Sequence, residues 1–270
     1  MASDNISQTI STPWPAEAIW EAVSPIWPDF TIEILPEIDS TNSELIRRAR
    51  HGMLEPTLLV AEHQTAGRGR LGKEWLSSRQ VDGASLTFSL GLPFAPADWY
   101  GLSLAAGLSI VQSLHTALQL KWPNDIWLEG RKLGGILIET VSVGDVRFAV
   151  VGVGINILPR DASGLQIAPA ALTEVLPDMN AAAALGSVVP QLVHTLQRFE
   201  LHGFAELRTA FHARDLLYGQ HVLCSDNLTG IARGVDANGA LMVHTAQGLK
   251  KISSAEVSIR PAAPLPLTNA

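Results

Sequence analysis

The segment between Gln64 and Trp75 combines glycines with three cations, Arg68, Arg70 and Lys73. Glycines let backbone N–H groups approach an anion closely, and the cations neutralise its charge. The chain as a whole is acidic, with 19 Lys and Arg against 26 Asp and Glu and a formal charge of −7. This balance argues against general nucleic-acid binding, which needs a basic face. The segment is therefore predicted to close over a small anion such as phosphate.

The same loop matches two phosphate-binding patterns by spacing, and both fail in detail. Gly67 to Lys73 has the GxxxxGK spacing of a P-loop, but Glu74 stands where a Ser or Thr hydroxyl should reach magnesium. The glycines also fit GxGxxG, but a dinucleotide site needs a strand directly before the first glycine and a helix directly after the last. Several residues separate the predicted strand from the loop, and no helical period follows it. Neither a P-loop nor a Rossmann turn is predicted.

Two polar groups near this loop are candidates for binding a ligand, and each has an ordinary structural alternative. Ser40 and Thr41 offer hydroxyls, but such residues commonly cap the helix that follows, and Thr41 with Glu44 forms a Thr-x-x-Glu capping box. Gln64 follows a predicted strand, where its amide can both donate and accept hydrogen bonds. A glutamine that simply faces solvent is the commoner case. Both alternatives stay open from the residue types alone.

Two later segments pair turns with cations or amides. In residues 121–125, Pro123 fixes a turn, and Asn124 either binds a ligand or satisfies the backbone of that turn. In residues 131–135, Lys132 lies on a hairpin turn, where cations are usually solvated. The two glycines that follow it permit close approach of a ligand. Glycines at 152 and 154 likewise leave Asn156 near a bare patch of sheet, with a β-bulge as the alternative.

Composition sets the remaining bounds. With 270 residues and 47% hydrophobic residues, the chain can hold one large domain and one small one. The single cysteine, Cys224, excludes an internal disulfide and a cysteine-rich metal site, which suits a reducing cytoplasm. No export signal is visible, and the apolar stretch 101–120 contains Gln and His and is better explained as a buried helix than as a membrane span. We expect a cytoplasmic protein that does not bind a membrane.

Periodicity predicts alternating helices and strands, followed by a stretch of short strands. Helices are expected over 16–23, 41–50, 99–118, 181–201 and 204–216, with Pro190 tolerated only in a first turn. Strands are expected over 31–38, 57–62 and 84–91, and an antiparallel meander over 125–128, 133–143 and 146–157. From about Leu217 onward, short strands at 221–224, 229–235, 240–244, 249–252 and 257–259 alternate with turns, which is typical of a small barrel. The proline-rich end is predicted to be disordered.

Taken in order, five segments closely resemble the signature segments of biotin protein ligases. They are Asp39-Ser40-Thr41-Asn42, residues 64–75, Lys121-Trp122-Pro123-Asn124-Asp125, residues 131–139 and Gly152-Val153-Gly154-Ile155-Asn156. The resemblance runs from about residue 35 to 260. It implies an α+β fold of the class II synthetase-like biotin/lipoate ligase type. The implied divisions are an N-terminal extension at 1–30, a mixed-sheet catalytic domain at 31–216, an SH3-like β-barrel at 217–262 and a disordered tail at 263–270.

The resemblance also implies the reaction. Biotin and ATP with Mg²⁺ would give biotinyl-5′-AMP, and a lysine of a biotin carboxyl carrier protein would then take the biotinyl group. That carrier would belong to acetyl-CoA carboxylase or to another biotin-dependent carboxylase. Carboxylate attack on a negatively charged phosphate needs fixed cations, and the implied catalytic residues are Lys132 and Arg68. A glycine-rich loop that orders with ligand would shield the labile adenylate from water.

Further site residues are carried over in the same way. Biotin would be bound by Ser40, Thr41, Asn42, Gln64, Arg68, Gly69, Arg70 and Lys132. ATP would be bound by Arg68, Arg70, Lys73, Lys132, Trp75, Asn124 and Asn156, and no metal site built by the protein alone is expected. Trp75 and neighbouring apolar strands would also cover the thioether ring and valeryl chain.

Two departures from the family pattern limit the transfer. Lys73 stands where an arginine is often found, which removes a bidentate contact. Only about 35 residues precede the first signature segment, too few for the helix-turn-helix domain of regulatory members, so we expect an enzyme without repressor activity and without a nucleic-acid partner. A monomer and a homodimer both remain possible, because an exposed sheet edge can pair or stay blocked.

Three alternative functions are related to this chemistry. An octanoyl transferase that works through a thioester is disfavoured, because it needs a cysteine in the catalytic domain and Cys224 lies in the predicted barrel. A lipoate-adenylating ligase would also need a lysine and phosphate donors, and it stays open apart from the arginine-rich loop that favours biotin. A non-catalytic biotin or nucleotide sensor would not require the full set of cations.

Overall fold

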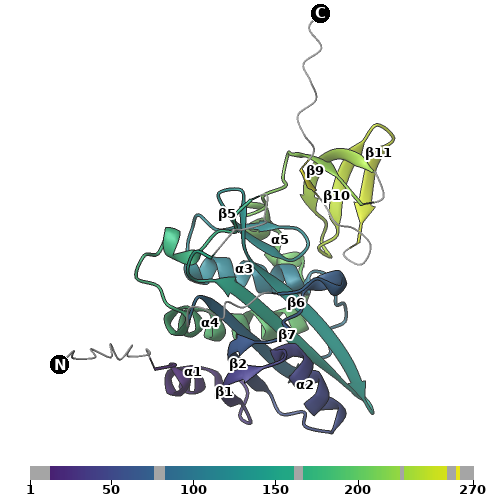
Figure 1. The fold of residues 1–270 in the computed structure, drawn as a ribbon. Helices are drawn as coiled ribbons and strands as arrows, with labels where there is room; N and C mark the ends of the chain where they lie inside the picture. Colours follow the sequence, from purple (N-terminus) through teal and green to yellow (C-terminus); the bar gives the residue numbers. More distant parts are fainter. Residues whose placement is uncertain (1–12, 76–82, 161–166, 226–227, 254–259, 262–270) are drawn as a thin grey trace, which may run out of the picture.

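The computed structural model describes residues 13–75, 83–160, 167–225, 228–253 and 260–261. A large α+β domain occupies most of these residues, and a small β unit follows it at the C-terminal end (Figure 1). The mixed α+β class predicted from the sequence is confirmed. No helix in these ranges is both long enough and apolar enough to traverse a lipid bilayer.

The large domain is built on one seven-stranded mixed sheet in the order β1-β2-β3-β7-β6-β5-β4. Its strands are β1 (Thr31–Ile38), β2 (Thr57–Gln64), β3 (Ser85–Pro93), β4 (Gln119–Lys121), β5 (Asp125–Leu128), β6 (Arg131–Val143) and β7 (Val146–Asn156). Only β1 and β2 pair in parallel, and every other neighbouring pair is antiparallel. A parallel pair needs a crossover, and α2 (Thr41–Arg50) supplies it. The predicted meander of β5, β6 and β7 is confirmed.

Helices cover the two faces of this sheet unequally. On one face α1 (Ala16–Val23), α3 (Leu102–Leu114) and α4 (Ala181–His202) bury the main core, to which β3 and β7 contribute alternate side chains such as Phe88 and Val151. On the other face α2 packs a smaller cluster around Leu45 and Phe148. Each strand alternates its side chains between the two faces. The face that carries α2 therefore has room beside that helix for a site.

The start of α2 corrects one prediction. Ser40, not Thr41, is the N-cap, and its Oγ accepts a hydrogen bond from the Ser43 amide at 3.4 Å. Glu44 does not reach back to the cap as a capping box requires. It bonds Arg47 and Arg48 in the last turn instead. The hydroxyl of Thr41 is thereby left to make other contacts.

Three helix predictions were also partly wrong. The helix predicted over 99–118 spans only Leu102–Leu114, because Gly101 before it has a φ of +81° and the backbone of His115 after it is extended. Pro190 lies in the interior of α4, where burial of neighbours such as Val189 against the core outweighs the lost hydrogen bond. The helix predicted over 204–216 is reduced to a 3₁₀ turn and α5 (Arg208–His212), because the backbone after it pairs with Leu120.

The C-terminal unit is one antiparallel sheet in the order β11-β10-β9-β8-β12. Its strands are β8 (His221–Leu223), β9 (Thr229–Val235), β10 (Leu241–Thr245), β11 (Gly248–Ile252) and β12 (Arg260–Pro261). The described residues show an open sheet, with no pairing between β11 and β12 that would close a barrel. The strand predicted at 257–259 and the tail at 263–270 lie outside the described residues.

This unit packs against the segment that joins β4 to β5. The indole Nε1 of Trp122, which is buried, donates to the carbonyl of Gly239 at 2.9 Å. Asn238 in the same turn donates to Asp98 at 3.0 Å. The C-terminal unit therefore supports residues 121–125 from outside the large sheet.

The buried carboxyl group of Asp215 should make the free energy of unfolding depend on pH. Its side chain is buried, Oδ1 accepts from the Leu217 amide at 2.9 Å, and burial raises its pKa to about 6. The folded state thus binds the proton more tightly than the unfolded state, so this group's contribution to stability falls by about 3 kcal/mol as pH rises from about 4 to above 6. Asp215→Asn keeps the Oδ1 acceptor and should remove that slope. Urea unfolding between pH 4 and 7 measures it, and parallel slopes in both proteins would contradict the assignment.

Candidate active site on the face of the sheet that carries α2

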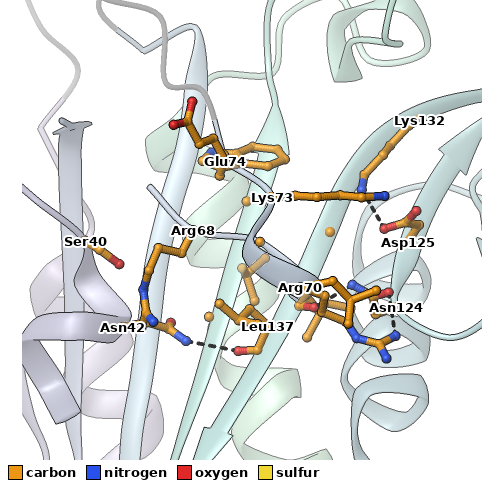
Figure 2. A pocket seen from close by; sticks show the side chains of 18 of the residues that line it. Ser40, Asn42, Arg68, Arg70, Lys73, Glu74, Asn124, Asp125, Lys132 and Leu137 are labelled. Carbon is orange, nitrogen blue, oxygen red and sulfur yellow. Dashed lines mark hydrogen bonds and ion pairs between the residues drawn. The ribbon is translucent and has the colours of Figure 1, made fainter. Parts of the chain in front are cut away.

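A cavity of about 250 Å³ opens on the sheet face beside α2, and segments far apart in the chain meet around it. Figure 2 shows Arg70, Lys73 and Lys132 on one side of it, with Ser40, Asn42 and the side chain of Arg68 on the other. The predicted site residues that line it are Ser40, Thr41, Asn42, Gln64, Arg68, Gly69, Arg70, Lys73, Trp75, Asn124 and Lys132. Asn156 is the one predicted site residue that the lining does not include.

A buried polar wall forms one side of the cavity. Gln64 Oε1 accepts hydrogen bonds from the Thr41 amide at 2.8 Å and from its hydroxyl at 3.1 Å. The Thr41 hydroxyl also contacts the Ser89 hydroxyl at 2.7 Å, and Ser89 donates to Asn42 Oδ1 at 2.6 Å. All four side chains are buried. Buried polar groups with fixed partners are pre-organised to recognise a polar ligand.

Glycines on β7 make this arrangement sterically possible. A Cβ at Gly152 would lie 2.0 Å from Asn42 Oδ1, and one at Gly154 would lie 2.5 Å from the indole of Trp75. Neither distance is compatible with a side chain. The two glycines let Asn42 and Trp75 lie directly on the sheet, so they serve close approach rather than a β-bulge, and β7 pairs regularly with both neighbours here.

The glycine and cation loop folds back on itself beside the cavity. Gly69 donates to the Lys73 carbonyl at 2.7 Å, and the Trp75 amide donates to the Gly67 carbonyl at 2.9 Å. A 3₁₀ turn over Arg70–Gly72 makes the tip. These contacts bring three cations of one short segment to the rim of the cavity.

Each cation that the resemblance placed at the reaction centre has a fixed partner in this structure. Lys132 Nζ lies 2.6 Å from Asp125 Oδ1, and Arg68 Nη2 lies 2.5 Å from Glu139 Oε2. Arg70 donates to Asn124 Oδ1 at 3.2 Å, and burial lowers the pKa of its guanidinium below the ordinary value. A guanidinium titrates far above neutral pH, so Arg70 keeps its charge. The partners hold the cations at the cavity.

Asn156 is placed behind Lys132 rather than in the cavity wall. Its Nδ2 donates to the Ala170 carbonyl at 3.1 Å, and the Ala170 amide donates to the Lys132 carbonyl at 2.9 Å. Asn156 Oδ1 is buried and has no hydrogen-bond partner in the described part of the chain. The side chain thus supports the backbone of Lys132 and keeps one acceptor available.

Sequence reasoning missed two polar residues at this site, Ser89 and Glu139. Ser89 carried a signal, since the alternation in β3 puts it on the face opposite Phe88, yet nothing indicated its partners. Glu139 is the last residue of segment 131–139, and no feature of its sequence neighbourhood indicates a contact with the loop. Among the described residues, no group of three or more His, Cys, Asp or Glu is placed to hold a metal ion.

The fit of Trp75 on Gly154 leads to a prediction. Gly154→Ala should push the indole off the sheet, because the added methyl would lie 2.5 Å from it. We expect Gly154→Ala to raise about tenfold the Michaelis constant for the small molecule that binds in this cavity. Gly135→Ala should raise it less, because the added methyl would lie no closer than 3.5 Å to other atoms. Steady-state kinetics compare the two variants. Equal constants in both would remove the role given to Gly154.

Comparisons with known proteins agree with this geometry. Residues 35–156 match the biotin/lipoate A/B protein ligase family, and residues 219–260 match the biotin protein ligase C terminal domain. The bifunctional ligase/repressor BirA of Escherichia coli is 33% identical over 246 residues, which cover 86% of this chain and 75% of that protein. The biotin--[acetyl-CoA-carboxylase] ligase of Mycobacterium tuberculosis is 31% identical over 251 residues, which cover 84% of this chain and 88% of that protein.

A solved structure shares the whole architecture. Biotin protein ligase from Aquifex aeolicus in complex with biotin and ATP superposes with a TM-score of 0.74 at 30% identity, covering 86% of this chain and 99% of that one. The match extends across both the large sheet and the C-terminal unit. On the family models, the relatives and the shared fold together, this chain belongs to the biotin protein ligase family.

Proposed function

We propose that this cavity joins biotin to AMP and then passes the biotinyl group to a lysine of a biotin carboxyl carrier protein. One observation carries the proposal: cations from the loop and from β6 line the same cavity as a wall of buried hydrogen-bonding side chains. A reaction between a carboxylate and a phosphate needs that combination. The relatives named biotin--[acetyl-CoA-carboxylase] ligase support the same reaction.

Lys132 is assigned to the point where the biotin carboxylate meets the α-phosphate. Both groups are anionic, so their approach is favoured only where fixed positive charge offsets the repulsion. The ion pair with Asp125 holds the Lys132 ammonium in place, and the hydrogen bond from Ala170 fixes its backbone. Arg68 and Arg70 are assigned to phosphate oxygens, which a planar guanidinium binds with two parallel hydrogen bonds.

The polar wall is assigned to the ureido ring of biotin. That ring offers one acceptor and two donors, and Thr41, Asn42 and Gln64 supply complementary groups beside Ser40. Gly69 and Arg70 contact the remainder of biotin from the loop. The indole of Trp75 and the apolar strand residues of the lining cover the thioether ring and the valeryl chain.

ATP is assigned to the side of the cavity that carries the loop cations. Lys73 and Asn124 line it, and Asn156 contributes from behind the wall by supporting the backbone of Lys132 through Ala170. Mg²⁺ fits this site as a companion of the phosphates, because it needs only one or two protein carboxylates. Glu74 and Asp125 are the carboxylates of the lining.

The remaining assignments rest on the resemblance to the family. The C-terminal sheet is assigned the SH3-like form, and its contact with Trp122 lets it support the ATP side of the cavity. A cytoplasmic location would bring the enzyme to its carrier protein. Monomer and homodimer are both compatible with the proposal.

A direct assay tests the function. The purified chain is incubated with labelled biotin, Mg-ATP and a carrier domain, and pyrophosphate release and labelled carrier are measured, with lipoate in a parallel arm. We expect both signals with biotin and neither with lipoate. Binding of biotin without pyrophosphate release would favour a sensor, and a signal with lipoate alone would favour the lipoate ligase alternative.

A further inference from the structure

Glu139 makes two contacts that connect the two halves of the site. The residue lies on β6, two positions after Leu137 of the cavity wall. Its Oε2 accepts from Arg68 Nη2 at 2.5 Å and from Asn42 Nδ2 at 2.9 Å. In the proposed function Arg68 belongs to the phosphate side and Asn42 to the biotin side. One carboxylate oxygen therefore joins them.

The connection continues through buried side chains to the far end of the polar wall. Asn42 accepts from Ser89, Ser89 contacts the Thr41 hydroxyl, and Thr41 bonds Gln64. Ser89 is completely buried, and Thr41 and Asn42 are nearly so. A continuous chain of hydrogen bonds thus runs from Arg68 to Gln64.

Glu139, together with the Leu137 carbonyl, determines the direction of these hydrogen bonds. The Asn42 amide nitrogen faces two acceptors, Glu139 Oε2 and the Leu137 carbonyl at 3.2 Å, so its oxygen must face Ser89. An amide oxygen only accepts, and Ser89 must therefore donate its one hydroxyl proton to Asn42. The Ser89 oxygen is then left to accept from Thr41.

The hydroxyl groups of the wall have one proton fewer than their hydrogen-bond contacts require. Two hydroxyl protons, from Thr41 and Ser89, serve three contacts at 2.6, 2.7 and 3.1 Å. With the proton of Ser89 committed to Asn42, that of Thr41 serves either Ser89 or Gln64. As long as the Asn42 amide keeps its orientation, the acceptor atoms of the wall are in fixed positions before a ligand that donates hydrogen bonds arrives.

Arg68 retains most of its donors in this arrangement. In the described part of the chain it gives Nη2 alone to Glu139, and a guanidinium has five N–H groups. Holding one edge of the guanidinium restricts the side chain and leaves the other edge for phosphate oxygens.

From these contacts we propose that Glu139 is a positioning residue of the ligase, which holds Arg68 at the cavity and fixes the Asn42 amide of the biotin-binding wall. The inference rests on the proposed function. It assigns Glu139 no contact with substrate and no role in proton transfer. Its loss should weaken biotin binding and loosen the grip on biotinyl-AMP together.

The test compares Glu139→Ala and Glu139→Gln with the unsubstituted chain, with Glu206→Ala as control. Glu206 is an exposed carboxylate paired with Arg198 and remote from the cavity. We expect Glu139→Ala to release biotinyl-AMP about tenfold faster and to raise the Michaelis constant for biotin about tenfold, with kcat for pyrophosphate release changed less than threefold because Lys132 stays in place. Glu139→Gln keeps a neutral acceptor and should fall between, because charge-assisted bonds are about twice as strong. The control should match the parent chain.

A double variant separates positioning from a general loss of structure. Arg68→Gly/Glu139→Ala should release biotinyl-AMP more slowly than the two single effects combined would give, because both changes remove the contact between Arg68 and Glu139. Additive rates would overturn the proposal, and so would parental release and biotin affinity in Glu139→Ala. Should that variant fail to fold, an unchanged release rate in Glu139→Gln would overturn it equally.

A calorimetric titration with biotin alone keeps the two proposals apart. This titration needs no ATP, so it measures the effect of Glu139 on biotin binding even in an enzyme that makes no biotinyl-AMP. A failure of the unsubstituted chain to make biotinyl-AMP would count against the proposed function alone. We expect about tenfold weaker biotin binding in Glu139→Ala. Equal affinity would contradict the role of Glu139 whatever the chemistry of the site.

Discussion

Arg68→Gly is expected to leave the fold intact and to release biotinyl-AMP about 10- to 100-fold faster than the unsubstituted chain. The side chain is 43% exposed and its ion pair lies at the surface, so it contributes at most about 1 kcal/mol to folding. A hydrogen bond to a charged phosphate contributes about 1.5–3 kcal/mol to binding, which corresponds to that range of rates. The glycine also removes the contact with Glu139. The loop would then no longer hold the intermediate.

Release is measured by trapping labelled biotinyl-AMP on the enzyme and following its escape over time. A second readout is the labelling of a bystander protein, whose lysines should react with the free adenylate. Arg198→Ala provides the control, because Arg198 is an exposed, ion-paired arginine on α4, away from the cavity. An Arg68→Gly enzyme that keeps its adenylate as long as the parent chain would refute the role of Arg68.

Lys132→Met should abolish most adenylation while biotin still binds. Removing one group that stabilises developing charge typically lowers kcat by about 10²- to 10³-fold, and Lys132 is assigned to the point of bond formation. The side chain is 45% exposed, so the melting temperature should hardly change. Methionine keeps an unbranched side chain of nearly the same length and removes the charge together with the N–H donors.

Single-turnover formation of biotinyl-AMP measures this effect without interference from transfer to the carrier. Lys132→Arg is the matched variant, because it keeps the charge and the pairing with Asp125 but changes its position. We expect its rate to lie between those of the parent chain and Lys132→Met. Adenylation by Lys132→Met at the parental rate would show that the lysine is not at the reaction centre.

The strands and most of the residues that line the candidate cavity could be predicted from the sequence, because their signals were local. Alternation located β3, and glycine pairs marked the bare surface of β7 on which Asn42 and Trp75 lie. The resemblance to the ligase family then placed the loop and Lys132 in one site, and the cavity brings them together. Asn156 differs, since it lies behind the lysine and supports it through Ala170.

The parts that escaped prediction depend on contacts between distant residues. Arg68 and Glu139 are 71 positions apart in the sequence, and no local sequence pattern indicates that they form an ion pair. The helix predicted over 204–216 is shortened for a similar reason. The backbone of Leu120, in a distant strand, forms hydrogen bonds with the backbone of Arg214 and Leu216 in place of helical ones. The shift of the α2 cap from Thr41 to Ser40 is small along the chain, yet it decides that Thr41 belongs to the cavity wall.

A crystal structure with bound biotinyl-AMP would test the central claim most directly, because it shows where the acyl phosphate lies. The account predicts Lys132 Nζ within about 3 Å of oxygens on both sides of the bond between the biotinyl and AMP groups. It also predicts Arg68 on the phosphate and the ureido ring against Thr41 and Gln64. Lys132 pointing into solvent, with the phosphate bound elsewhere, would contradict the mechanism.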